Sequence, residues 1–127
     1  MKVRRILLVD DDSDDSELFL EALHDLDASI TCRSATDGVD ALKKLDSPER
    51  PDIIFLDVNM PRMDGWECLD AIRNNPSFQE IPVVMYSTSS HEKEVKKAHS
   101  KGANHFFKKP DSFIALKETL RHVIGLG

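Results

Sequence analysis

Acidic side chains follow directly after two short apolar runs of this chain. Residues 53–56 (IIFL) lead into Asp57. Residues 6–9 (ILLV) lead into a run of acids that begins with Asp10 and Asp11. Carboxylates that lie close together raise one another's pKa unless a cation joins them. Oxygen ligands in an open site favour Mg²⁺, which keeps several waters and often shares its shell with a phosphoryl group. If the fold brings these acids together, they predict a Mg²⁺ site.

A hydroxyl group and an ammonium group follow two further apolar runs. Ser87 comes after residues 81–86, and Lys109 comes after residues 105–107 and Lys108. Beside a bound cation and one remaining carboxylate, these groups complete a set that can carry out phosphoryl transfer. The carboxylate attacks phosphorus in line, the cation and the lysine neutralise charge on the equatorial oxygens, and the hydroxyl donates a hydrogen bond to one of them.

Such a site needs elements that deliver these side chains to one place. The hydrophobic pattern predicts five strands that alternate with five helices. The predicted strands are residues 4–10, 30–35, 52–57, 81–86 and 105–107, and the predicted helices are residues 13–26, 38–46, 64–74, 90–101 and a last helix that starts at an Asp111 or Ser112 cap. This alternation predicts an α/β fold with a doubly wound parallel sheet and helices on both faces. Ligands of such sheets bind at the carboxyl ends of the strands, where the groups above lie.

Apolar spacing identifies the helix side chains that are expected to face the core. The first helix carries an amphipathic stripe made of Leu18, Phe19, Ala22, Leu23 and Leu26. Ser13 or Asp14 is expected to cap this helix. The fourth helix is polar, and its inward candidates are Val95, Ala98 and His99.

Length and composition exclude several classes of protein. A chain of 127 residues predicts one domain, here residues 1–127, with no effector domain. The net charge of −6 argues against a general nucleic-acid binder, which normally has a basic face. No apolar run approaches the roughly 18 residues that a membrane span needs. Cys32 and Cys68 lack metal or paired-motif spacing, and we interpret them as reduced thiols of a cytoplasmic protein.

Several motifs, in this order and at this spacing, resemble one known family. They are ILLVDD (6–11), IFLDVNMPRMDG (54–65), PVVMYSTS (82–89) and GANHFFKKP (102–110) with the Lys-Pro pair inside it. Over essentially its whole length, the sequence resembles the receiver domain of response regulators in two-component signalling. It is similar to single-domain, chemotaxis-regulator-like members, and its YSTSS and KKPDSF segments are similar to regulators of the cyanobacterial-phytochrome type. The resemblance implies a flavodoxin-like strand order, 2-1-3-4-5.

The resemblance also implies roles for the acids. Asp57 matches the phosphoacceptor, which forms an acyl phosphate. Asp10 and Asp11 match the acid pair that holds Mg²⁺, with Asp11 as the direct ligand and Asp10 acting through water. The backbone carbonyl of Asn59 matches the third protein ligand of the ion.

The remaining family positions concern the response to phosphorylation. Ser87 matches the switch Ser or Thr, and Phe106 matches the rotating aromatic switch residue. Lys109 matches the phosphate-binding lysine, and its bond to Pro110 is expected to be cis. Three residues depart from the commoner pattern and bear on the lifetime of the acyl phosphate: Tyr86, Thr88 and Lys108.

The implied function is that of a phosphoacceptor signalling domain, not of a conventional enzyme. A sensor histidine kinase is the expected phosphoryl donor. The expected output is a contact with a downstream protein, or transfer to a histidine phosphotransfer protein, with no direct nucleic-acid or membrane partner. The face made by the fourth helix, fifth strand and fifth helix is expected to change on phosphorylation and is a candidate homodimer interface.

Alternative interpretations remain at this stage. The chain could be a pseudo-receiver that binds a partner without phosphorylation, or a Mg²⁺-dependent phosphatase whose acids resemble a DxD motif. Residues 10–21 partly mimic a calcium-binding EF-hand loop, but Asp15 occupies the position that needs Gly. The lysines of the fourth helix form either a solvated face or a docking face for an acidic partner, and they are Lys93, Lys96, Lys97 and Lys101.

Overall fold

The structure is a computed structural model that describes residues 3–88 and 91–125. Within these residues, five strands alternate with five helices. The strands are β1 (Arg5–Val9), β2 (Thr31–Ala35), β3 (Ile53–Asp57), β4 (Val83–Ser87) and β5 (His105–Lys108). The helices are α1 (Ser13–Leu26), α2 (Gly38–Leu45), α3 (Gly65–Arg73), α4 (Glu92–Ser100) and α5 (Phe113–Val123).

The strands form one parallel sheet in the order β2-β1-β3-β4-β5. This confirms the predicted doubly wound fold and its flavodoxin-like strand order. β3 lies at the centre of the sheet, and each of its five residues is buried. In the register between β3 and β4, Asp57 pairs with Tyr86. The last residue of the central strand therefore lies beside the penultimate residue of its neighbour.

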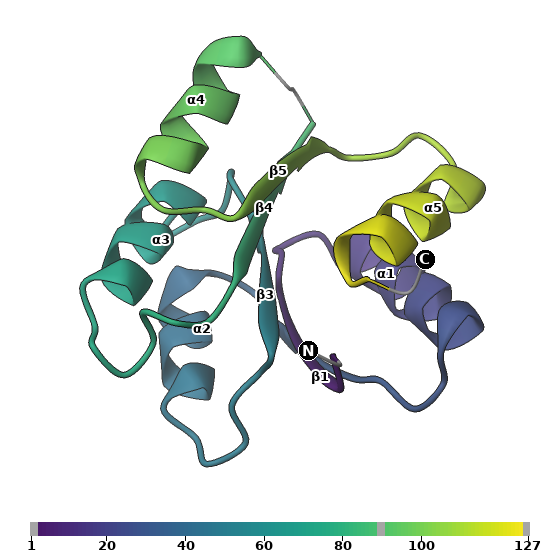
Figure 1. Cartoon of the computed structure of the whole chain (residues 1–127), viewed down its shortest axis with the longest axis horizontal. Helices are drawn as coiled ribbons and strands as arrows, with labels where there is room; N and C mark the ends of the chain where they lie inside the picture. Colours follow the sequence, from purple (N-terminus) through teal and green to yellow (C-terminus); the bar gives the residue numbers. More distant parts are fainter. Residues whose placement is uncertain (1–2, 89–90, 126–127) are drawn as a thin grey trace.

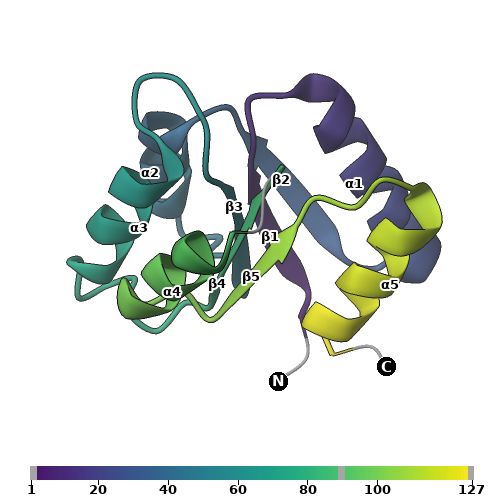
Figure 2. The same cartoon turned by 90° about the horizontal axis from the view of Figure 1, so that it is seen from above.

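Helices cover both faces of the sheet. α1 and α5 pack on one face, and α2, α3 and α4 pack on the other (Figures 1 and 2). Because successive side chains of a strand point to opposite faces, the apolar strands supply two cores. Leu7 belongs to the core under α2 to α4, whereas Leu8 belongs to the core under α1 and α5. In the second core, Phe19 of α1 meets Phe55 of β3 edge to face at 5.0 Å.

Helix caps fix where most helices begin. The Asp12 side chain accepts hydrogen bonds from the backbone N–H groups of Asp14 and Asp15, so Asp12 caps α1. The prediction that Ser13 or Asp14 caps this helix was therefore wrong, because Ser13 is already the first residue of the helix. Ser112 caps α5, as one of the two expected alternatives.

The two polar caps that flank the site are also acids. The Asp37 side chain accepts from the N–H of Asp40 at the start of α2. Asp64 and Glu67 form a reciprocal capping box at the start of α3. Each carboxylate satisfies a backbone donor that the first helical turn leaves unpaired.

Two side chains expected in the core lie at the surface. Leu18 is 46% exposed, because it lies at the rim between α1 and α5. His99 is exposed, and Ala98 is the buried residue of α4. The predicted start of this helix at Ser90 lies outside the described residues. Strand and helix bounds elsewhere differ from the predictions by at most two residues, and β4 extends through Ser87.

Across the described part of the chain, each helix is either too short or too polar to cross a bilayer.

Candidate functional site

The ends of four neighbouring elements place the predicted groups at one edge of the sheet. Asp10 directly follows β1, Asp57 ends β3, Ser87 ends β4, and Lys109 directly follows β5. These strands are parallel, so their carboxyl ends lie at the same edge. The structure thus brings together groups that are up to 99 positions apart in the sequence.

The acids form a compact cluster. One carboxylate oxygen each from Asp10, Asp11 and Asp57 lies within 4.8 Å of the others. Asp10 and Asp57 are 4% exposed, whereas Asp11 is exposed to solvent. The cluster thus combines two sheltered carboxylates with one at its open side. Such an all-oxygen donor set with room for water fits Mg²⁺ or Mn²⁺.

Lys109 supplies the positive charge at this cluster. Its Nζ lies 3.4 Å from Asp57 Oδ2, 3.3 Å from Asp10 Oδ2 and 3.0 Å from Asp15 Oδ2. Burial by itself lowers the pKa of a lysine, but the Asp15 hydrogen bond and the neighbouring charges outweigh it and raise the pKa of Lys109 above its ordinary value. Lys109 is therefore a fixed cation beside Asp57.

The backbone holds the Lys109 segment against β4. The N–H of Lys109 donates to the carbonyl oxygen of Ser87 at 2.7 Å. The bond between Lys109 and Pro110 is trans, so the expected cis bond was wrong. Trans is the lower-energy isomer for most X–Pro bonds, and the segment reaches the site in that form.

The Asp57 carboxylate is destabilised in its ionised form. Burial raises the pKa of Asp57 to about 7, and the negative charge of Asp10 adds to this effect. The Lys109 charge and the Asn59 N–H oppose the shift but do not cancel it. A cation that binds beside this carboxylate favours its ionised form, which is the nucleophilic one.

The loop after β3 wraps closely around Asp57. The N–H of Asn59 donates to Asp57 Oδ1 at 3.4 Å, and the N–H of Gly65 donates to the carbonyl of Val58 at 2.9 Å. A Cβ atom at Gly65 would lie 2.2 Å from the Asp57 carbonyl oxygen. Only glycine allows α3 to begin this close to the strand end. The metal-binding role of the Asn59 carbonyl stays a prediction.

An ion pair that the sequence analysis missed anchors the same loop. The Arg62 Nε donates to Asp37 Oδ2 at 2.6 Å. The hydrogen bond from Arg62 holds the pKa of the Asp37 carboxyl below its usual range. Arg62 adopts a positive φ of 61°, and the N–H of Gly38 donates to the carbonyl of Met63. These contacts tie the loop to the start of α2.

Ser87 and Phe106, the two residues with expected switch roles, lie on the neighbouring strands β4 and β5. Ser87 is 1% exposed at the end of β4, and Phe106 lies half-buried on the next strand. Phe106 packs against the core under α2 to α4, which includes Met85 of β4. Their roles in switching stay predictions.

Two further side chains reach the site, and the sequence analysis did not place them there. The Tyr86 hydroxyl donates to Asp10 Oδ2 at 2.7 Å, and Asp15 of α1 pairs with Lys109. Burial and the neighbouring carboxylates raise the pKa of Tyr86 well above its ordinary value, so the hydroxyl stays protonated. The sequence signal for Tyr86 was a phenol near the end of a buried strand. Asp15 was considered as part of the EF-hand-like loop, where it occupies the position that needs Gly.

Other candidate sites do not form among the described residues. The candidate metal-binding group found there combines Asp10 and Asp11 with Asp57 instead of with Asp14 and Asp15, which lie inside α1. The EF-hand alternative therefore does not fit. Cys32 and Cys68 are free thiols, and burial raises the pKa of each to about 12, so neither is a nucleophile at neutral pH.

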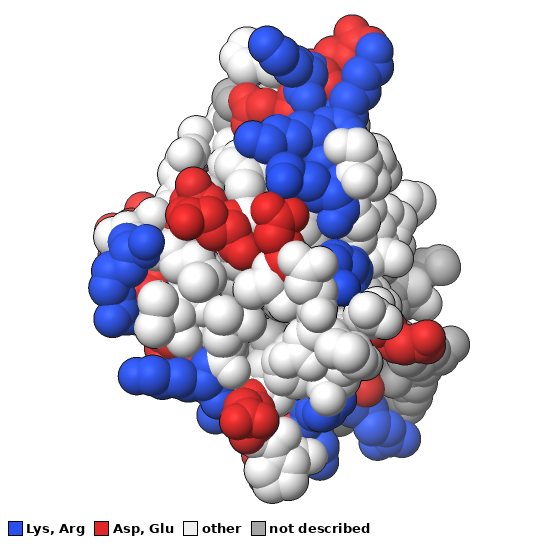
Figure 3. Space-filling model, turned by 90° about the vertical axis from the view of Figure 1, so that its left-hand side faces the viewer, with Lys and Arg blue, Asp and Glu red and all other residues white. Residues whose placement is uncertain are grey.

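The lysines of α4 are mostly exposed. Figure 3 shows Lys and Arg side chains gathering at the top of the face, where α4 lies. Lys96 pairs with Glu92 on the same helix at 3.2 Å. Lys97 Nζ lies 4.4 Å from the centre of the Trp66 ring, and Lys101 pairs with Asp70. Lys97 and Lys101 therefore also link α4 to α3.

Comparison with known proteins gives one consistent result. The family model for the response regulator receiver domain matches residues 6–121. Chemotaxis protein CheY1 of Helicobacter pylori is 33% identical over 121 residues, covering 95% of this chain and 97% of its own. Response regulator Rcp1 of Synechocystis is 33% identical over 127 residues, covering 95% of this chain and 84% of its own.

Solved structures agree with the sequence comparison. The phosphorylated cyanobacterial phytochrome response regulator RcpA superimposes with a TM-score of 0.85 at 29% identity, covering 95% of this chain and 91% of its own. The Mn²⁺-bound form of Rcp1 superimposes with a TM-score of 0.85 at 31% identity, covering 95% of this chain and 94% of its own.

Proposed function

Because this chain belongs to the response regulator receiver domain family, we propose that it accepts a phosphoryl group on Asp57 from a sensor histidine kinase in a Mg²⁺-dependent reaction. One observation carries this proposal: the buried Asp57 carboxylate lies against Lys109 and within 4.8 Å of two further carboxylates. Two relatives support the proposal, because the structure of RcpA is of its phosphorylated form and that of Rcp1 is of its Mn²⁺-bound form.

The residues of this chain divide the chemistry among them. An oxygen of the Asp57 carboxylate forms the new bond to phosphorus, while the bond from phosphorus to the donor nitrogen breaks and that nitrogen leaves with a proton. Lys109, 3.4 Å from Asp57, neutralises charge on the transferred group. The Ser87 hydroxyl donates a hydrogen bond to one of its oxygens. The product is an acyl phosphate.

The acid cluster would hold the cation. Asp11 and Asp57 would be the direct side-chain ligands, the Asn59 carbonyl would be the third protein ligand, and Asp10 would act through water. When bound, Mg²⁺ neutralises phosphoryl oxygens and offsets the repulsion among the three carboxylates.

The output follows from the change at the end of β4. A phosphoryl group adds charge and acceptor oxygens that draw Ser87 toward Asp57. Phe106 then turns inward, and the face made by α4, β5 and α5 changes by a population shift between two packings. We propose that this face contacts a downstream protein, a histidine phosphotransfer protein or a second copy of the chain, in the cytoplasm.

The alternatives fit less well. A pseudo-receiver needs no cation, whereas oxygens of Asp10, Asp11 and Asp57 lie within 4.8 Å of one another with Lys109 beside Asp57, which favours a site that binds one. A phosphatase would need a pocket for its organic substrate at the acid cluster. The cavity between α1 and α5 is lined by Lys109 and Asp15 but not by Asp57.

Intact-mass analysis after incubation with Mg²⁺ and phosphoramidate tests the proposal. Wild type should gain one phosphoryl group. Asp57→Asn should gain none, and neither should wild type with a chelator present. Asp46→Asn, which removes an exposed carboxylate after α2, is the control and should behave as wild type.

If no adduct is found, beryllofluoride distinguishes the two explanations, because it mimics the acyl phosphate without hydrolysing. A beryllofluoride complex in wild type would mean that the site is competent and that the adduct hydrolyses before it is measured. No adduct and no beryllofluoride complex would refute phosphorylation at Asp57 and favour the pseudo-receiver.

A further inference from the structure

Tyr86 connects the acid cluster to the core under α1 and α5. Its ring is 5% exposed and stacks on Phe107 of β5, with ring centres 5.7 Å apart and planes 13° apart. Lys109 Nζ lies 4.9 Å from the centre of the same ring. The ring therefore lies between an aromatic neighbour and a cation, and its hydroxyl reaches Asp10. Tyr86 thus contributes a polar contact to the site from the face of the sheet that α1 and α5 cover.

The Asp10 carboxylate is held from both of its oxygens. Oδ1 accepts from the N–H of Asp12 at 2.9 Å. Oδ2 accepts from the Tyr86 hydroxyl at 2.7 Å and from Lys109 Nζ at 3.3 Å. A carboxylate offers about four lone-pair sites, so these three bonds leave about one for a water or a cation. The direction of that remaining site depends on how the three donors orient the carboxylate.

The three donors are not equivalent. Lys109 is shared with Asp57 and Asp15 and has to serve the phosphoryl group as well. The Asp12 N–H belongs to the turn that opens α1. The Tyr86 hydroxyl makes the shortest of the three bonds to Asp10, and its rigid ring has two rotatable bonds. It is the donor that is free to hold Asp10 while Lys109 changes partners.

We propose that Tyr86 is a positioning residue for the divalent cation: its hydroxyl orients the Asp10 carboxylate, and this orientation sets the affinity of the acid cluster for the ion. The proposal rests on the Mg²⁺ site proposed above. Loss of a partner that orients a metal-binding carboxylate typically lowers metal affinity about 10- to 100-fold. Because Asp10 keeps two other donors, we expect an effect of about tenfold, near the lower limit.

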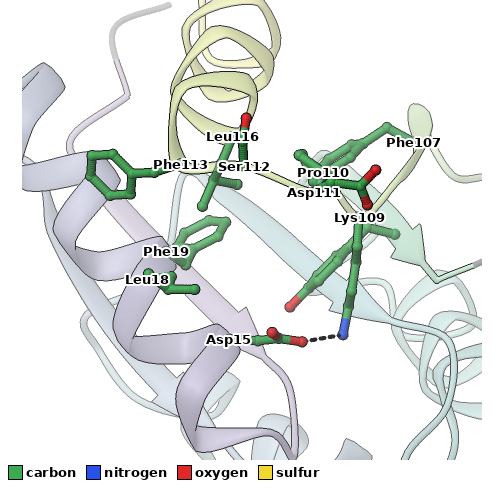
Figure 4. Close-up of a pocket in the computed structure, with 11 residues that line it drawn as sticks. Asp15, Leu18, Phe19, Phe107, Lys109, Pro110, Asp111, Ser112, Phe113 and Leu116 are labelled. Carbon is green, nitrogen blue, oxygen red and sulfur yellow. Dashed lines mark hydrogen bonds and ion pairs between the residues drawn. The ribbon is translucent and has the colours of Figure 1, made fainter.

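The surroundings of Tyr86 explain why an aromatic ring fits at this position. A cavity of about 110 Å³ lies beside it, between α1 and α5. Figure 4 shows Lys109 reaching toward Asp15 at one side, while Phe19, Phe113 and Leu116 line the side formed by the two helices. The apolar wall and the stack on Phe107 leave the hydroxyl directed to Asp10.

Mn²⁺ binding measured by electron paramagnetic resonance tests the proposal directly, because free and bound Mn²⁺ give different signals. Tyr86→Phe removes the hydroxyl and keeps the ring, its stack and its contact with Lys109. We expect Mn²⁺ to bind this variant about tenfold more weakly than wild type. Binding within twofold of wild type would overturn the proposal.

Phe107→Leu is the matched control, because it removes the stacking partner of Tyr86 and leaves the hydroxyl in place. We expect it to lower the free energy of unfolding and to bind Mn²⁺ within twofold of wild type. Equal loss of Mn²⁺ affinity in both variants would overturn the proposal, since packing would then explain the effect.

Tyr86 is the single tyrosine of the chain, which allows a second measurement that keeps its hydroxyl in place. Labelling with 3-fluorotyrosine gives one ¹⁹F resonance. We expect Mg²⁺ to shift it in a saturable manner, with reversal by chelator. An unchanged resonance at saturating Mg²⁺ would overturn the proposal even if Tyr86→Phe failed to fold.

The same titrations separate this proposal from the proposed function. Absence of Mn²⁺ binding in wild type would refute the metal site and the role of Tyr86 together. Wild-type binding that Asp11→Asn abolishes and Tyr86→Phe leaves unchanged would refute the role of Tyr86 alone.

Discussion

Replacement of Asp57 by Asn should stabilise the metal-free protein, and the gain should increase with pH. Burial raises the pKa of Asp57 from 3.8 to about 7. A carboxyl group whose pKa is higher in the folded state binds its proton more tightly there. Its contribution to stability is therefore greatest below pH ~4, falls as the pH rises through about 7, and is constant above that. Asn at this position has no such dependence.

The two pKa values set the size of the effect. At pH ~8 the ionised Asp57 costs the folded state about 4 kcal/mol, since each pKa unit corresponds to about 1.4 kcal/mol. At pH ~5 the cost is roughly 2 kcal/mol, because the Asp57 carboxyl is then mostly ionised in the unfolded state and still protonated in the folded state. The advantage of Asp57→Asn over wild type should thus grow by about 2–3 kcal/mol between these pH values.

Urea unfolding of both proteins at the two pH values, with a chelator present, measures this difference. Asp46→Asn removes an exposed carboxylate and controls for the change in net charge. Added Mg²⁺ should make wild type the more stable of the two proteins. The ion stabilises wild type by binding to its folded state, whereas the variant lacks the Asp57 ligand and binds the ion less well. A difference between Asp57→Asn and wild type that stays constant from pH ~5 to ~8 would refute the account of a destabilised, buried carboxylate.

Three further predictions concern the surroundings of Asp57. Gly65→Ala should lower the free energy of unfolding by at least about 2 kcal/mol and slow phosphorylation, because the new Cβ would meet the Asp57 carbonyl. In the same urea titration Gly38→Ala should cost less, because its new Cβ meets only the flexible Met63 side chain. Asp15→Asn should cost less than about 1 kcal/mol, since Asp15 is 41% exposed in its pair with Lys109, and a larger loss in urea unfolding would mean that the pair is a structural anchor. Arg62→Gly should unfold at a higher urea concentration than Arg62→Ala, because both lose the pair with Asp37 but only glycine adopts φ 61° without strain; the reverse order would contradict this conformation.

Much of the fold could be predicted from the sequence because its signals are local. The runs ILLV and IIFL are continuous and apolar, as expected for strands buried on both faces. Alternation with amphipathic helices then leaves a parallel sheet as the consistent arrangement. Because ligands bind at the carboxyl ends of such strands, the proximity of Asp10, Asp57 and Lys109 could be predicted from the sequence.

Details at the ends of elements were less predictable. Asp12, Ser13 and Asp14 can all accept a capping hydrogen bond, and Asp12 does so because it is the residue with extended backbone just before the helix. Leu18 belongs to the apolar stripe by spacing, but α5 covers only part of α1 and leaves this side chain at the rim of the cavity.

The sequence by itself thus determined that Asp10, Asp57, Ser87 and Lys109 follow strand ends at one edge of the sheet, because strand ends follow from local patterns. The strand order was implied by the family resemblance. Only the tertiary structure decided which side chains touch. Tyr86 and Asp10 are 76 positions apart, and Asp15 and Lys109 are 94 apart. Such contacts depend on the register of the strands and on the direction of each side chain, and these are set when the two faces of the sheet pack against their helices.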